Sequence, residues 1–150
     1  MDQSSDTKIR ARSTSRTLPI ALLRARETVM LPIREMLQEI NLTEQKWRIL
    51  RTLDEMGEVE QSAISKEACM LLPSLTRTLR AMEAEGLILR RQDEEDKRRT
   101  QVQISDKGRG LLADNILQAL EVYAAIEDQL GREKITHLLD LLEELRNVKV

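Results

Sequence analysis

The spacing of apolar residues changes once along this chain, between residues 87 and 104, and this change most restricts the possible fold. On both sides of it, apolar side chains recur every three or four residues, as on one face of an α-helix. Inside it, "TQVQIS" alternates polar and apolar residues and "LILRR" precedes it, a pattern typical of two short strands. The sequence therefore predicts a mainly α-helical chain with one small β-hairpin, whose tip is Asp93 to Arg99.

The helices are predicted from their apolar stripes and end signals. The expected segments are 18–40 with a bend near Pro32, Thr43 to Gly57, 61–68, Pro73 to Gly86, a helix capped by Ser105 that ends at Gly131, and a last helix after it. Residues 1–17 lack periodicity, which predicts a flexible tail. The central part, 43–105, has the order of a winged helix-turn-helix. Residues 18–150 are expected to be one domain, in which 18–42 and 106–150 pack against a partner chain, because their stripes exceed what a small winged unit can cover.

Composition supports this fold class and limits the function classes. With no Phe, one Trp, one Tyr and few Gly or Pro, helices are favoured over a β-sandwich. The single cysteine, Cys69, excludes an intrachain disulfide and fits a reducing compartment, where we expect it to be a buried, inert thiol. The polar N-terminus has no signal peptide and no apolar run is long enough to span a membrane, so a cytoplasmic location is expected.

One face of the helix that begins at Pro73 has the chemistry of a DNA-reading surface. When Leu75, Leu79 and Met82 face the core, the opposite side and its flank carry Ser74, Thr76, Arg77, Arg80, Ala81 and Ala84. Arginine can bind guanine bidentately, hydroxyls can reach bases or phosphates, and alanines allow close approach. An ordinary solvated face would look similar. The position of this helix, followed directly by a basic hairpin, favours DNA.

The hairpin tip is basic although the chain has a net charge of −2. Arg98 and Arg99 are placed to enter a minor groove, where narrow A·T segments attract arginine. Lys97, Arg90 and Arg91 are better placed for phosphates. A solvated charged turn is the alternative interpretation.

The segment "DKRRTQVQISDKG" resembles the wing signature of the MarR family of bacterial transcription regulators, and "EAEGLILRR" is similar to the segment that leads into it. The stretches "LLRARETVMLPIREML", "LTEQKWRILRTL" and "ACMLLPSLTRTL" resemble the subgroup that controls degradation of homoprotocatechuate and related aromatic acids. This resemblance implies a homodimer that binds a pseudo-palindrome, usually as a repressor. It also implies that Arg98 reaches the minor groove, that Asp96 fixes the wing through an ionic contact, and that Ser74, Thr76 and Arg77 lie on the recognition helix.

The resemblance further implies a small-molecule effector, because family members commonly release DNA when an aromatic acid binds between the dimerisation helices and the winged unit. An anionic ligand needs a cation beside apolar walls. The candidate cations are Arg26 first, then Arg24 and Arg16, and the candidate walls are Met30 and Trp47. Arg26 could equally pair with a helix acid, and Trp47 could belong to the core.

Two other classes of protein are compared with a DNA-binding regulator by their sequence requirements. An enzyme is not expected, because the chain has no Gly-rich phosphate loop and no nucleophile–base pair, and His137 has no neighbouring His or Cys for a metal site; no cofactor is predicted. A winged-helix protein-interaction adaptor without DNA readout is the alternative. Steep salt dependence of binding would separate a DNA reader from such an adaptor.

Overall fold

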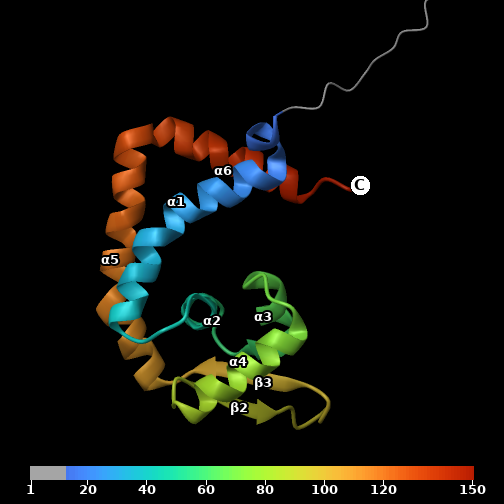
Figure 1. The fold of residues 1–150 in the computed structure, drawn as a ribbon. Helices are drawn as coiled ribbons and strands as arrows, with labels where there is room; N and C mark the ends of the chain where they lie inside the picture. Colours follow the sequence, from blue (N-terminus) through green and yellow to red (C-terminus); the bar gives the residue numbers. More distant parts are fainter. Residues whose placement is uncertain (1–12) are drawn as a thin grey trace, which may run out of the picture.

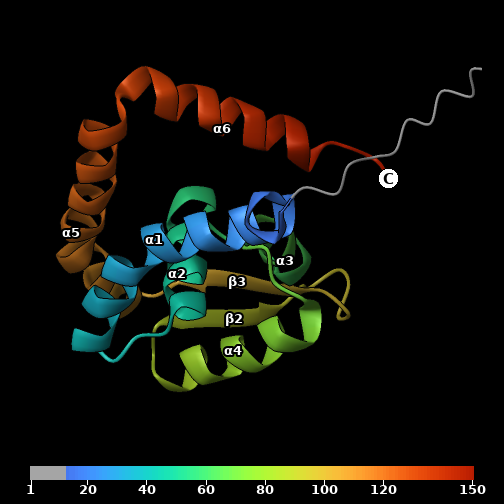
Figure 2. The same cartoon turned by 45° about the horizontal axis from the view of Figure 1, so that its top comes forward.

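The computed structural model describes residues 13–150 and shows a winged unit from which two long helices extend (Figure 1). The elements are a 3-10 helix Thr14–Arg16, α1 Leu18–Glu39, α2 Glu44–Met56, β1 Val59–Glu60, α3 Gln61–Glu67, α4 Leu72–Ala84, β2 Ile88–Gln92, β3 Thr100–Ile104, α5 Asp106–Leu130 and α6 Arg132–Arg146. Helices α2 to α4 and the sheet lie together, α5 leads away from them, and α6 turns back toward the first half of α1 (Figures 1 and 2). The predicted fold class, mainly α with a winged helix-turn-helix, is confirmed.

The sheet has three antiparallel strands in the order β1-β3-β2. The hairpin of β2 and β3 was predicted. In the structure, Ile88 of β2 lies opposite Ile104 of β3. Strand β1 was missed, because two residues are too short to show an alternating pattern. Val59 pairs with Val102, so β1 closes the free edge of β3.

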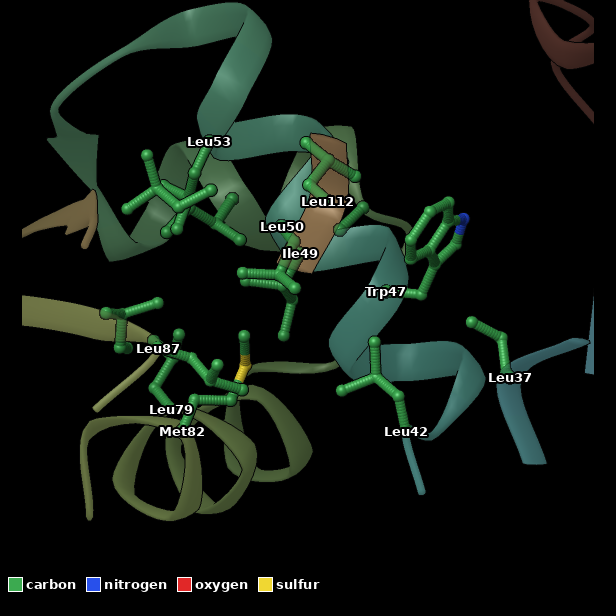
Figure 3. Close-up of a cluster of buried hydrophobic side chains, with 14 of the residues drawn as sticks. Leu37, Leu42, Trp47, Ile49, Leu50, Leu53, Leu79, Met82, Leu87 and Leu112 are labelled. Atoms are coloured by element: carbon green, nitrogen blue, oxygen red, sulfur yellow. The ribbon is translucent and has the colours of Figure 1, made fainter. Parts of the chain in front are cut away.

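The hydrophobic core joins α1, α2, α3, α4, the sheet and α5, and part of it is drawn in Figure 3. Its fully buried members are Ile33, Leu37, Ile49, Leu50, Leu53, Ile64, Leu75, Leu79, Met82, Ile88 and Val102. The predicted inward stripe of α4, Leu75 with Leu79 and Met82, is confirmed by this burial. Since α4 is held along its whole inner face, its outer face is presented rigidly.

Helix ends follow their sequence signals. The Thr43 hydroxyl accepts a hydrogen bond from the backbone N–H of Lys46 (3.2 Å), which caps α2 as predicted. The Ser105 hydroxyl accepts from the N–H of Gly108 (3.0 Å) and donates to the carbonyl of Gly86 (2.5 Å), so it caps α5 and ties α5 to the turn after α4. Helix α1 continues through Pro32 and changes direction along its length (Figure 1).

Cys69 differs from the sequence prediction. It was expected to be buried, but it is exposed, because the turn between α3 and α4 places it in the left-handed region at φ 53°. Most of the predicted tail, residues 1–12, lies outside the described residues, and Thr14–Arg16 form the 3-10 helix. Among residues 13–150, no helix has the length and apolar character needed to cross a membrane.

Candidate nucleic-acid interface

The outer face of α4 carries two arginines that are available to a partner. Arg77 and Arg80 are exposed, and within residues 13–150 neither forms an ion pair. Ala81 and Ala84 are also exposed, and they add no bulk to this face. A flat, cationic helix face of this kind can lie deep in a major groove with both guanidinium groups directed at base edges.

Thr76 lies on the same helix, but its hydroxyl is already engaged. It accepts a hydrogen bond from Nε2 of Gln61 (2.6 Å) and donates to the carbonyl of Leu72 (2.9 Å). Gln61 belongs to α3, so this contact holds the two helices of the helix-turn-helix together. Thr76 thus helps to fix α4 against α3.

A shallow groove of about 380 Å³ separates α4 from the N-terminus of α2. Its lining residues are Thr43, Gln45, Lys46, Met70, Ser74, Arg77, Thr78 and Ala81. Ser74, a predicted contact residue, therefore faces this groove together with Arg77. Lys46, which sequence reasoning did not select, forms an ion pair with Glu85 just after α4. The sequence signal for this part of the site was the N-cap of α2, because the N-terminus of a helix carries a partial positive charge.

The wing is a tight turn organised by Asp96. Its carboxylate accepts a hydrogen bond from the backbone N–H of Arg98 (3.0 Å), and its carbonyl accepts from the N–H of Arg99 (2.9 Å). The ionic partner of Asp96 is Arg99, at 3.7 Å. Lys97 and Arg98 are exposed, and neither forms an ion pair in the described part of the chain.

The other predicted wing cations are already paired. Arg90 donates to Glu83 of α4 (3.0 Å), its side chain is only 21% exposed, and its Nε is buried without a partner in the structure. Arg99 also pairs with Glu60 of β1 (3.1 Å). Arg90 therefore joins β2 to α4, while Lys97 and Arg98 are wing cations that form no ion pair within residues 13–150.

The ion pair of Arg90 and Glu83 predicts that part of the unfolding free energy depends on pH and is lost in acid. The hydrogen bond from Arg90 holds the pKa of Glu83 below its ordinary value of 4.5. A lowered pKa stabilises the folded chain above that value, and the stabilisation is lost as the pH falls through the lowered pKa. We expect Glu83→Gln to reduce the unfolding free energy by about 0.5 kcal/mol at neutral pH. Urea unfolding should show this difference disappearing in acid, and Glu143→Gln on α6 serves as control. A difference that persists unchanged at a pH below the lowered pKa of Glu83 would contradict this role.

A large apolar hollow lies apart from α4 and the wing, between α1, α5 and α6. It has a volume of about 1010 Å³ and is lined by Leu18, Ala21, Leu22, Ala25, Arg26, Val29, Met30, Tyr123, Ile126, Glu127, Ile135, Leu138, Leu139, Leu141, Leu142 and Leu145. Arg26 and Glu127 are the charged residues of this lining, and Arg26 is paired with Glu44 at the start of α2. Arg26 and Met30, both predicted ligand contacts, are thus brought together.

The remaining predicted ligand contacts lie elsewhere. Arg16 and Arg24 are exposed and do not line the hollow. Trp47 is 4% exposed and belongs to the core cluster, near Leu37 and Leu42 (Figure 3). A second hollow, of about 270 Å³ between α2 and α5, contains Arg51 and Arg109, which sequence reasoning did not select.

A helix-turn-helix with a cationic second helix and an adjoining cationic wing defines a winged-helix DNA-binding protein. The chain belongs to the MarR family, whose sequence pattern matches residues 42–100. It is 41% identical over 128 residues to the homoprotocatechuate degradative operon repressor of Escherichia coli, an alignment that covers 85% of this chain and 86% of that protein. The chain is therefore a MarR-family transcriptional regulator.

Two solved structures are similar along most of the chain. NadR in complex with 4-hydroxyphenylacetate is 37% identical with a TM-score of 0.80, and the match covers 93% of this chain and 99% of NadR. The transcriptional repressor CouR bound to a 23-mer DNA duplex is 28% identical with a TM-score of 0.75, and the match covers 89% and 94% of the two chains.

Proposed function

We propose that this regulator is a homodimeric repressor that binds a pseudo-palindromic operator and is released from it by a small aromatic carboxylate. The DNA-binding part of this proposal rests on four exposed cations that form no ion pair within residues 13–150. They are Arg77 and Arg80 on α4, and Lys97 and Arg98 on the wing. Arg77 and Arg80 would contact base edges in the major groove, and Arg98 would enter the adjacent minor groove. Ser74 would contribute a hydroxyl beside Arg77.

The homodimer is supported by the apolar surface of the long helices. Leu22 of α1 and Leu138 and Leu139 of α6 are among many exposed apolar side chains, and α6 has no buried residue. A surface of this kind is unfavourable in water and is typical of a subunit interface. A two-fold axis through these helices would present two copies of α4 to successive major grooves, about one DNA turn apart.

The effector is proposed to be a hydroxyphenyl carboxylate. NadR, similar to this chain along most of its length, is in complex with 4-hydroxyphenylacetate, and the E. coli relative is a repressor of a homoprotocatechuate operon. In this chain Arg26 is the cation of a mostly apolar lining that also contains Glu127, and its guanidinium group pairs with Glu44. Arg51, in the smaller hollow, is the second candidate for holding the carboxylate.

The first experiment is a fluorescence anisotropy titration of the full chain on the DNA upstream of its own gene. Binding should tighten strongly as salt is lowered, because several phosphates are neutralised. Addition of 4-hydroxyphenylacetate or 3,4-dihydroxyphenylacetate should release the DNA, whereas phenylethanols without a carboxylate should not. Salt-insensitive or absent binding would favour the adaptor function over DNA readout.

Variants Arg26→Ala and Arg51→Ala separate the two candidate ligand sites. The variant that lacks the carboxylate partner should bind DNA normally but need a much higher concentration of effector, about tenfold or more, since a charged hydrogen bond is lost. If both variants respond to the effector as the unmodified chain does, neither arginine holds the carboxylate.

A further inference from the structure

We propose that Glu58 and Glu60 weaken DNA binding by holding two arginines of the wing, Arg91 and Arg99, away from the phosphate backbone. This inference rests on the proposed function as a DNA-binding regulator. It assigns a role to the short strand β1 and the residue before it, which sequence reasoning missed.

The contacts are specific and cross the sheet. Arg91 on β2 lies 2.5 Å from a carboxylate oxygen of Glu58, and Arg99, just before β3, lies 3.1 Å from a carboxylate oxygen of Glu60. Glu60 pairs in register with Gln101, and Gln101 pairs with Arg91, so side chains of this row project from one face of the sheet. The acids at the edge strand β1 thus meet Arg91 of β2 and Arg99 of the turn before β3.

These ion pairs are weak enough for DNA to displace. The side chains of Arg91 and Arg99 are 56% and 57% exposed, and exposed pairs contribute little to stability. The pair of Arg90 and Glu83 is different, because Arg90 is mostly buried and fixes β2 to α4. Only the exposed pairs can therefore exchange a carboxylate for a phosphate without disturbing the fold.

The charge balance gives the direction of the effect. Residues 58–60 and 88–104, which form the sheet and the wing, contain six acids and five bases. A phosphate approaching this unit meets Lys97 and Arg98 as free cations, while the other arginines are neutralised locally. Removal of Glu58 and Glu60 would release Arg91 and would leave Arg99 with only its longer contact to Asp96, at 3.7 Å.

The test compares operator binding of the unmodified chain with Glu58→Gln, Glu60→Gln and the double variant. We expect the double variant to bind about five- to tenfold more tightly at about 0.1 M salt. The slope of log affinity against log salt should become steeper by about one to two, because each new phosphate contact adds about 0.9. A role in folding alone would not steepen this slope. The control is Glu27→Gln with Glu143→Gln, which removes the same charge from two exposed Glu–Arg pairs on α1 and α6.

A second cycle shows whether the acids act through the arginines. In a chain that carries Arg91→Ala and Arg99→Ala, removal of Glu58 and Glu60 should change affinity by less than twofold. A persistent gain there would mean general repulsion and would overturn the proposal. Unchanged or weaker binding by the double glutamine variant would also overturn it, while salt-sensitive binding of the unmodified chain would leave the proposed function intact. No binding by the unmodified chain would reject the proposed function itself.

Discussion

Replacing both Arg77 and Arg80 with alanine is expected to lower operator affinity by roughly 100-fold, because each well-placed arginine–base contact contributes about 1–3 kcal/mol of discrimination. Both side chains are exposed on α4, and neither forms an ion pair in residues 13–150, so their removal should leave folding unchanged. Anisotropy titrations with operator DNA and with a scrambled duplex of the same length would measure the effect. The loss should be much larger on the operator, since base contacts and not phosphate contacts carry sequence information.

The matched control is Arg132→Ala with Arg146→Ala on α6. These two arginines are also exposed and helical, but they lie outside the winged unit. The control should retain nearly full operator affinity. Equal losses on operator and scrambled DNA for the α4 variant would contradict base readout and would assign Arg77 and Arg80 to phosphates.

Local sequence signals were sufficient for the helices and the hairpin of this fold. The stripe of Leu75, Leu79 and Met82 predicted the buried face of α4, and the same spacing placed Arg77 and Arg80 outside. The helix caps have equally local causes, because the hydroxyls of Thr43 and Ser105 accept hydrogen bonds from backbone N–H groups only three residues ahead. Such features depend on neighbours in the chain, so they can be deduced without a three-dimensional structure.

Pairing of Arg26 with a helix acid was one of the open alternatives, but the particular partners of Arg26 and of Arg99 across the sheet could not be predicted, because they are distant in sequence. Arg99 and Glu60 are 39 positions apart in the sequence, and they meet only because β1 joins the edge of the sheet. Arg26 meets Glu44 only because α1 packs beside the start of α2. The sequence therefore shows which residues are cationic, but it does not show which of these cations form ion pairs in the fold.

Burial of single residues shows the same limit. The sequence left Trp47 open as a ligand wall or a core residue, and the packing of α1 against α2 places it in the core, where it is 4% exposed. Cys69 was expected inside, yet a left-handed turn places it at the surface. Hydropathy gives the tendency of a residue to be buried, but the turn and the neighbouring helix decide where its side chain points.

Gly108→Ala is expected to be among the most destabilising single substitutions in the chain. A methyl group on Gly108 would lie 2.2 Å from the carbonyl oxygen of Leu87, 3.0 Å from Ile104 and 3.2 Å from Leu50. The first of these contacts is with backbone, which cannot rotate away, so the start of α5 would have to move from the sheet. Forced overpacking of a buried site typically costs about 1–3 kcal/mol, and here the cap from Ser105 to Gly108 would be disturbed as well. We therefore expect the unfolding free energy to fall by about 3 kcal/mol in urea titrations.

Gly110→Ala provides the control two residues further along the same helix. A methyl group there would meet no atom within 4 Å, and alanine favours the helical backbone over glycine by about 1 kcal/mol. This variant should be slightly more stable than the unmodified chain, while Gly108→Ala is much less stable. Opposite signs for the two substitutions would show that the close packing of α5 on the sheet, and not helix propensity, requires glycine at 108. A similar gain at both positions would mean that α5 can move from the sheet at little cost, and the rigid placement of the wing beside α4 would then need another cause.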